Sequence, residues 1–224
     1  MSGGFPVDLI LFGMVAAFLV LRLRSILGRR QGYERPPEPL NPRPPADARV
    51  GDPALGDGPA VPVVAGPTKV LPDARTPPGQ ALARIKGIDP NFDADAFLDG
   101  ASGAFGMIVT GFAAGDRALL KTLLAPDLFT AFEGAISARE AANETQRTEI
   151  TSLRELTLTE ADLRGTVASV TVRFVSDQIN QSRDAAGQVV AGTDVPTETV
   201  DFWSFERDLR GTDPTWLLVA TRSE

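Results

Sequence analysis

Residues 166–178 read TVASVTVRFVSDQ, and this stretch decides the fold class. Every second residue in its centre is apolar: Ala168, Val170, Val172 and Phe174. Successive side chains of a strand point to opposite faces, so this period of two predicts a long strand with one buried face. The aromatic-rich residues 197–207 predict a second strand, and residues 182–194, SRDAAGQVVAGTD, supply the turn between them.

The residues before these strands have helical spacing. A helix is predicted from Asp93 onward, because apolar residues recur at every third or fourth position. Its apolar face holds Phe97, Ala101, Phe105, Ile108 and Phe112. Gly100, Gly103 and Gly106 repeat at steps of three, which predicts an adjoining face that packs closely. Shorter helices are predicted after Asp116 and from Pro126, since proline is favoured in a first turn. The last helix is expected to bury Leu128, Phe129, Phe132 and Ile136.

The order of these elements predicts the fold class. The period of two begins near Thr148, and a last strand is predicted over residues 215–221. Helices followed by a meander of strands indicate an α+β domain, with N-terminal helices packed on one face of a curved antiparallel sheet. The predicted domain spans residues 85–224.

The composition excludes several kinds of chemistry. The chain contains neither cysteine nor histidine, which excludes disulfides, thiolate or imidazole metal sites, and imidazole-dependent triads. The only tyrosine, Tyr33, lies outside the predicted domain. A lone strand carboxylate such as Asp177 or Glu206 is more often ion-paired than catalytic. We therefore expect no enzyme, cofactor or metal; a buried carboxylate with a raised pKa in a closed pocket would favour an enzyme.

Charge is distributed unevenly along the chain. Residues 1–80 hold nine Lys or Arg and seven Asp or Glu, whereas residues 81–224 hold thirteen and twenty-two. An acidic domain repels phosphates, and the sequence has no basic stripe with interleaved aromatics. Nucleic acid is therefore not an expected partner.

A proline-rich spacer is predicted over residues 28–84. Thirteen of the eighteen prolines lie between Gly28 and Gly79. Proline fixes φ and lacks a backbone N–H, so this segment is expected to be an extended, disordered tether. An inert tether is favoured over a docking peptide for a partner that reads PxxP motifs.

The N-terminal residues 1–27 contain the apolar run LILFGMVAAFLVL, residues 9–21. Extended to Phe5 and Leu23, a helix would be about 28 Å long, close to the bilayer core of roughly 30 Å. The run is followed, not preceded, by basic residues, which are Arg22, Arg24, Arg29 and Arg30. This pattern favours a retained transmembrane anchor over a cleaved signal peptide or a buried core helix. By the positive-inside rule, the N-terminus lies outside and the domain is cytoplasmic.

An ordered set of motifs resembles the Tim44-like domain family, and more closely its bacterial TimA group of membrane-anchored adaptors. The motifs are IDP (88–90), FL (97–98), AF (104–105), FAAGD (112–116), LLAP (123–126), VTVRF (170–174), DFWSFERDL (201–209) and DPTWLLVAT (213–221). The resemblance covers about residues 85–222. It implies a cone-like sheet of the nuclear-transport-factor-two type, whose helices close an apolar groove. In mitochondria the family member tethers the protein import motor to the inner-membrane channel.

The groove implied by the resemblance has eight candidate lining residues. They are Phe97, Phe105, Phe112, Phe132, Phe174, Phe202, Phe205 and Trp216. The alternative for each residue is a position in the hydrophobic core.

We therefore expect a non-catalytic adaptor anchored in the bacterial inner membrane, acting in protein translocation or membrane-complex assembly. The expected partners are membrane lipid, through the N-terminal helix, and a protein of an inner-membrane complex; the groove would accept a protein or lipid partner. One alternative is a structural subunit that acts through its helix, where Gly13 and Ala17 permit close packing. A cone-fold enzyme that uses carboxylates is the other alternative.

Overall fold

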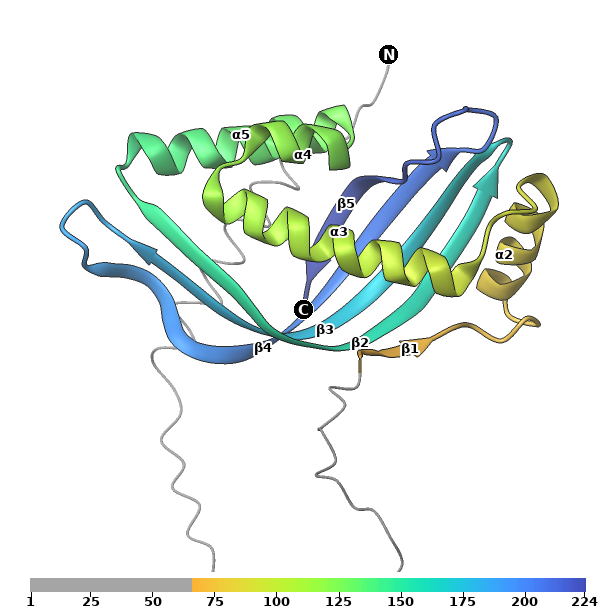
Figure 1. Cartoon of the computed structure of the whole chain (residues 1–224), viewed down its shortest axis with the longest axis horizontal. Helices are drawn as coiled ribbons and strands as arrows, with labels where there is room; N and C mark the ends of the chain where they lie inside the picture. The colour runs from red at the N-terminus through yellow and green to blue at the C-terminus, as the bar shows by residue number, and fades with distance from the viewer. Residues whose placement is uncertain (1–65) are drawn as a thin grey trace, which may run out of the picture. The chain divides into compact units, whose positions relative to one another are not determined.

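The computed structural model describes residues 66–224, and Figure 1 shows the arrangement of the elements in this region. In chain order they are β1 (Thr68–Val70), α2 (Pro77–Ile88), α3 (Ala94–Ala114), α4 (Arg117–Leu123), α5 (Pro126–Ala141), β2 (Thr145–Arg164), β3 (Val167–Arg183), β4 (Val189–Asp208) and β5 (Leu217–Ser223). The predicted anchor and most of the predicted spacer lie outside the described residues. The α+β class is confirmed.

The five strands form one sheet in the order β1-β2-β3-β4-β5. Strands β2 to β5 pair antiparallel, as predicted, but β1 pairs parallel to β2, with Thr68 opposite Glu155. The sheet is therefore mixed, and the prediction of a purely antiparallel sheet is wrong. Parallel pairing requires a long crossover, and here helices α2 to α5 supply it.

The predicted boundary between spacer and domain is also wrong, because β1 and α2 belong to the fold. Pro77 and Pro78 occupy the first turn of α2, where a missing N–H costs nothing. Thr76 caps this helix, since its side-chain oxygen accepts a hydrogen bond from the Gly79 N–H. Ala81 and Ile85 are buried. The prediction from proline content placed the start of the domain at residue 85, inside α2, and so assigned β1 and most of α2 to the spacer.

Helix α3 crosses the concave face of the sheet (Figure 1) and contributes more residues to the core than any other helix. It begins directly after Asp93, close to the predicted start, and Asp93 caps it. Leu98, Phe105 and Ile108 are almost fully buried. The Phe105 ring stacks on Phe174 of β3, with centroids 4.5 Å apart and planes 10° apart. Within the described residues, α3 is the one helix long and apolar enough to cross a membrane, yet its apolar face packs on the sheet.

One expectation about helix packing is wrong, and another is confirmed only in part. A Cβ atom added to Gly100, Gly103 or Gly106 would meet nothing within 4 Å, so these glycines face open space and no element packs against them. In α5, Ile136 is fully buried, whereas Leu128, Phe129 and Phe132 are only partly buried, although they also pack against the core. Helix α5 lies next to α4, away from the middle of the sheet, and covers less of the sheet than α3 does (Figure 1).

Candidate functional site

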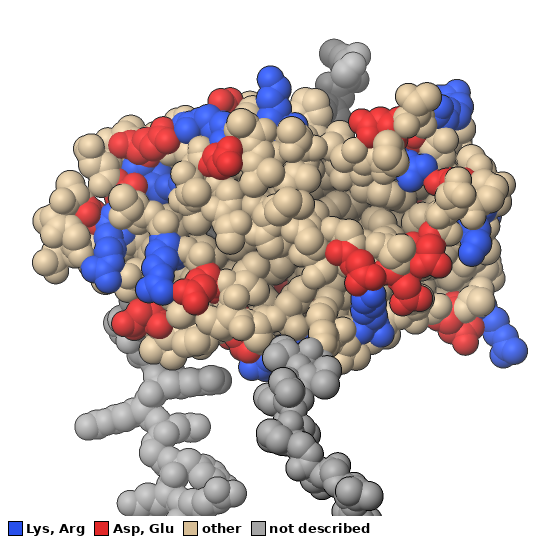
Figure 2. All heavy atoms as spheres, viewed as in Figure 1, with Lys and Arg blue, Asp and Glu red and all other residues tan. Residues whose placement is uncertain are grey.

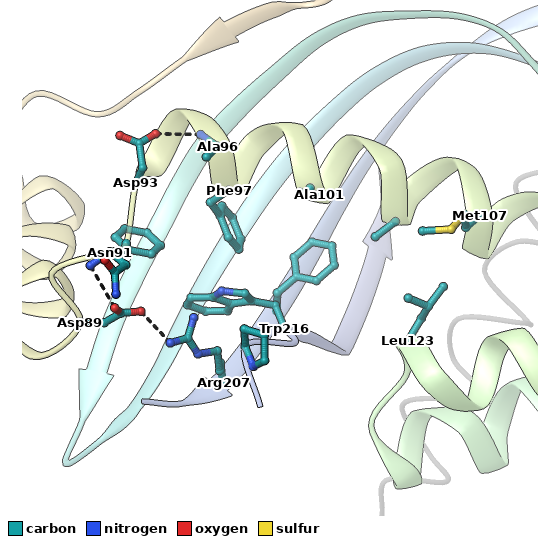
Figure 3. Close-up of a pocket in the computed structure, with 15 residues that line it drawn as sticks. Asp89, Asn91, Asp93, Ala96, Phe97, Ala101, Met107, Leu123, Arg207 and Trp216 are labelled. Carbon is teal, nitrogen blue, oxygen red and sulfur yellow. Dashed lines mark hydrogen bonds and ion pairs between the residues drawn. The ribbon is translucent and has the colours of Figure 1, made fainter. Parts of the chain in front are cut away.

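An open groove of about 510 Å³ lies beside α3 (Figure 3). One wall is α3 and the end of α4; the opposite wall comes from β4 and the segment that precedes β5. The loop that joins α2 to α3 forms one end. Figure 2 shows the face of the domain on which α3 lies, and its charged side chains are found mostly near the margins, so that the centre of this face is largely uncharged. A groove of this kind suits an apolar ligand or partner segment.

Aromatic side chains form the deepest part of the groove. Trp216, which is partly exposed, lies edge-on to Phe97, with ring centroids 4.9 Å apart. Phe92 packs 5.9 Å from Trp216, and Phe97 makes a T-shaped contact with Phe205 at 6.0 Å. These offset and edge contacts fix the rings in place. The Trp216 ring therefore offers a rigid, accessible apolar surface.

Small side chains form the α3 wall. Ala96, Gly100 and Ala104 succeed one another along the helix and leave its backbone close to the groove. Met107 stands at the far end beside Leu123 of α4, and 44% of Met107 is exposed (Figure 3). A flexible, exposed methionine next to a smooth helix surface adapts well to a partner side chain.

The other end of the groove is polar. Asp89, the residue after α2, accepts a hydrogen bond from Arg207 of β4, with Oδ2 and Nη2 2.6 Å apart. The side chains of Asp89 and Arg207 are only 14% and 15% exposed. Arg207 also lies against the Trp216 ring, and its Nε is buried without a hydrogen-bond partner in the described part of the chain. Asp93 adds a carboxylate that caps α3.

The structure brings three of the eight predicted groove residues together at this site: Phe97, Phe205 and Trp216. Phe105 and Phe174 are core residues with no exposed surface. Phe112 and Phe132 pair with each other between α3 and α5, with centroids 5.0 Å apart. These four are not lining residues of the groove.

Phe202 lies on the opposite face of the sheet. Its neighbour Trp203 packs against Phe105, and alternation along β4 turns Phe202 away from the helices. There the Arg222 guanidinium covers its ring at 3.6 Å. The prediction that Phe202 lines the groove is therefore wrong.

Sequence reasoning missed several residues that line the groove: Asp89, Phe92, Met107, Leu123 and Arg207. Phe92 follows the IDP motif and immediately precedes the helix predicted from Asp93 onward, and this position was the available signal. The pairing of Asp89 with Arg207 joins residues 118 positions apart, so no local pattern predicts it.

A buried carboxylate lies elsewhere on the sheet. Asp201 is 9% exposed, and burial raises its pKa above the ordinary aspartate value, although Ser223 and Gln178 donate hydrogen bonds to it. Asp201 is not among the residues that line the groove. Within residues 66–224, no group of three or more acidic side chains could hold a metal ion.

Comparison with known proteins adds a family match. A family model described as the Tim44-like domain matches residues 79–223. No curated protein matches the chain. Among solved structures, the intermembrane-space region of the chloroplast protein ARC6 is similar at 10% identity and a TM-score of 0.43, over 60% of this chain and 98% of that chain. A Streptomyces avermitilis protein described as a dehydratase of the NTF2-like family is similar at 16% identity and a TM-score of 0.35, over 58% and 96%.

Proposed function

We propose, because this chain belongs to the Tim44-like domain family, that it is a membrane-associated, non-catalytic adaptor that binds a partner segment in the groove beside α3. The family match supports a translocation-related adaptor role. The observation that carries the proposal is an open apolar groove with a rigid aromatic floor and one polar end. The finer assignment to a cone-like sheet of the nuclear-transport-factor-two type is part of this proposal.

The charge of the domain favours a protein segment over an anionic lipid. Residues 66–224 hold fifteen Lys or Arg and twenty-three Asp or Glu. Arg207 is neutralised by Asp89, so the carboxylate of Asp93 is left as the net charge at the polar end of the groove. A lipid phosphate there would be repelled, whereas a lysine or arginine would be attracted. The favoured occupant is an amphipathic segment with an apolar face and basic residues.

The proposed cellular location of the domain rests on the sequence of the segments that precede it. We propose a single-pass anchor in residues 1–27 of a bacterial inner membrane, with the N-terminus outside and the domain in the cytoplasm. Protease added to intact spheroplasts should then leave the domain whole, whereas protease added to inverted vesicles should release it. The opposite result would contradict this topology.

A non-catalytic role is preferred because acid–base groups do not converge in the groove. The carboxylate with the raised pKa, Asp201, is satisfied by Ser223 and Gln178 and lies outside the groove lining. Of the two carboxylates at the groove, Asp89 is engaged by Arg207 and Asp93 accepts a hydrogen bond from the Ala96 N–H. All three carboxylates therefore have structural partners.

The test uses the full chain in detergent and two synthetic 18-residue amphipathic peptides, one of leucine and lysine and one of leucine and glutamate. The lysine peptide should bind, more weakly at high salt, and the glutamate peptide should not. Met107→Glu should reduce binding at least about tenfold, because it places a charge in the apolar groove. Val195→Glu is the matched control, since Val195 is 61% exposed and lies on β4 outside the groove. Equal binding by both variants would contradict the proposal.

A further inference from the structure

We propose that β1 and α2, which we call the strap (residues 68–88), couple the N-terminal segment to the groove. In this proposal the docked strap completes the groove, so that strap docking and partner binding stabilise each other. The inference rests on the proposed function, because it concerns the regulation of the same groove. In Figure 1, β1 and α2 lie at the same end of the sheet, next to the start of α3.

The first part of the strap is held by few interactions. Strand β1 pairs with β2 over only three residues, at the edge of the sheet. Lys69 at its centre forms an ion pair with Asp99 of α3, with Nζ and Oδ1 2.5 Å apart. The Asp99 side chain is 67% exposed, and such a pair contributes little free energy. Local release of β1 therefore costs much less than unfolding of the domain.

The second part of the strap leads directly into the groove. Helix α2 ends at Ile88, and Asp89 then makes the ion pair with Arg207. The Phe92 N–H donates to the Asp89 carbonyl, which folds the α2–α3 loop so that Phe92 packs on Trp216. The end wall of the groove is thus the immediate continuation of the strap. Movement of α2 would carry Asp89 and Phe92 with it.

The direction of the coupling follows from the contacts. Release of the strap removes Phe92 from one side of the Trp216 ring and Asp89 from Arg207, so a partner would lose part of its binding surface. A partner that binds only the complete groove has an apparent affinity reduced by the fraction of molecules with the strap released. Reciprocally, a bound partner holds the strap in place. The docking state of β1 is therefore transmitted to the groove through α2 and the α2–α3 loop.

The test perturbs the strap at a residue outside the groove. Lys69→Glu places a carboxylate beside Asp99 and should favour release, while the charge swap Lys69→Glu with Asp99→Lys should restore docking. Because the chain has no cysteine, Val70→Cys with Thr157→Cys offers a disulfide that locks β1 on β2 at paired positions. All variants are made in the full chain.

The first measurement needs no partner. Trp203 is 5% exposed, so quenching of fluorescence by acrylamide reports mainly on Trp216. Lys69→Glu should increase this quenching and speed amide hydrogen exchange over residues 77–93, and the charge swap should reverse both effects. If Lys69→Glu changes neither quantity, or if the swap does not restore them, the coupling is wrong.

The second measurement is the affinity for the leucine–lysine peptide. We expect Lys69→Glu to weaken binding about fivefold, the charge swap to recover it, and the oxidised disulfide variant to bind at least as tightly as its reduced form. Failure of the locked form to bind would overturn the proposal, because the strap would then have to open to admit a partner. If the parent chain does not bind the peptide but Trp216 quenching responds as expected, the groove function fails and the strap coupling stands.

Discussion

Asp89 and Arg207 lie 118 residues apart in the sequence, and their ion pair joins the end of α2 to β4 with Oδ2 and Nη2 2.6 Å apart. Both side chains are mostly buried, so removal of one charge leaves the other charge buried without its partner. Asp89→Asn should therefore lower the free energy of unfolding of the full chain by about 2–4 kcal/mol in urea titrations. Asp89→Asn with Arg207→Met should recover part of this loss.

A matched control for that substitution is available on the surface. Glu149→Gln breaks the ion pair of Glu149 with Arg147, in which both side chains are more than half exposed. Its effect on the free energy of unfolding should stay below about 0.5 kcal/mol. If Asp89→Asn and Glu149→Gln changed the free energy of unfolding equally, the Asp89–Arg207 pair would not hold the α2–α3 loop in place.

The core and the groove should respond differently to the loss of an aromatic ring. Phe105→Ala should reduce the free energy of unfolding by about 3–5 kcal/mol, because Phe105 is fully buried against Phe174. Trp216→Ala should cost less stability, since Trp216 is partly exposed, but should abolish binding of the leucine–lysine peptide. Urea denaturation and peptide titration separate the two effects. A binding-competent Trp216→Ala variant would contradict the assignment of the groove.

Substitution by alanine should change the free energy of unfolding in opposite directions at two glycines. A Cβ atom on Gly103 of α3 would meet nothing within 4 Å, so Gly103→Ala should raise the free energy of unfolding by about 0.5–1 kcal/mol. A Cβ atom on Gly79 would lie 2.2 Å from the Asp73 carbonyl oxygen, so Gly79→Ala should destabilise the fold. Thermal unfolding of both variants tests the prediction, which fails if the two shifts in Tm have the same sign.

The pH dependence of stability should reveal Asp201. Because burial raises the pKa of Asp201 in the folded state, its stabilising contribution is present at low pH and is lost as the pH rises through that raised pKa. Asp201→Asn cannot ionise. The free energy of unfolding of the variant, relative to the parent, should therefore increase as the pH rises from about 4 toward 7. A difference that stays constant over this range would show that Asp201 titrates at the same pH in both states.

The corrected domain boundary has a direct consequence for fragments. Residues 66–224 should unfold cooperatively by circular dichroism, because they include β1 and all of α2. Residues 85–224, the domain predicted from the sequence, should be less stable, since they lack Ala81 and begin inside α2. Identical unfolding curves would show that the strap adds nothing to the fold.

Local sequence patterns predicted the elements whose signals lie within a few residues. The alternation in residues 166–178 corresponds to β3, and α3 begins directly after Asp93, close to the predicted start. Periodicity reports which face of an element is buried, so Phe97 and Phe105 were correctly assigned to one apolar face. The absence of cysteine and histidine likewise limits the chemistry of the whole chain, because no fold can supply a thiol or an imidazole that the sequence lacks.

The tertiary structure decided what lies in the groove and what lies in the core. Phe202 and Trp203 are adjacent in the sequence and point to opposite faces of β4, but only the packed chain decides that the helices cover the face of Trp203 and not that of Phe202. The parallel pairing of β1 and the contact of Asp89 with Arg207 join residues separated by more than eighty positions. Hydrophobic periodicity is a local property, whereas strand order, register and long-range ion pairs depend on how the whole chain packs. The sequence by itself therefore determined the helices from α3 onward, the antiparallel strands and the apolar face of α3. Only the packed chain decided the place of β1 and α2, and which aromatic rings remain open to a partner.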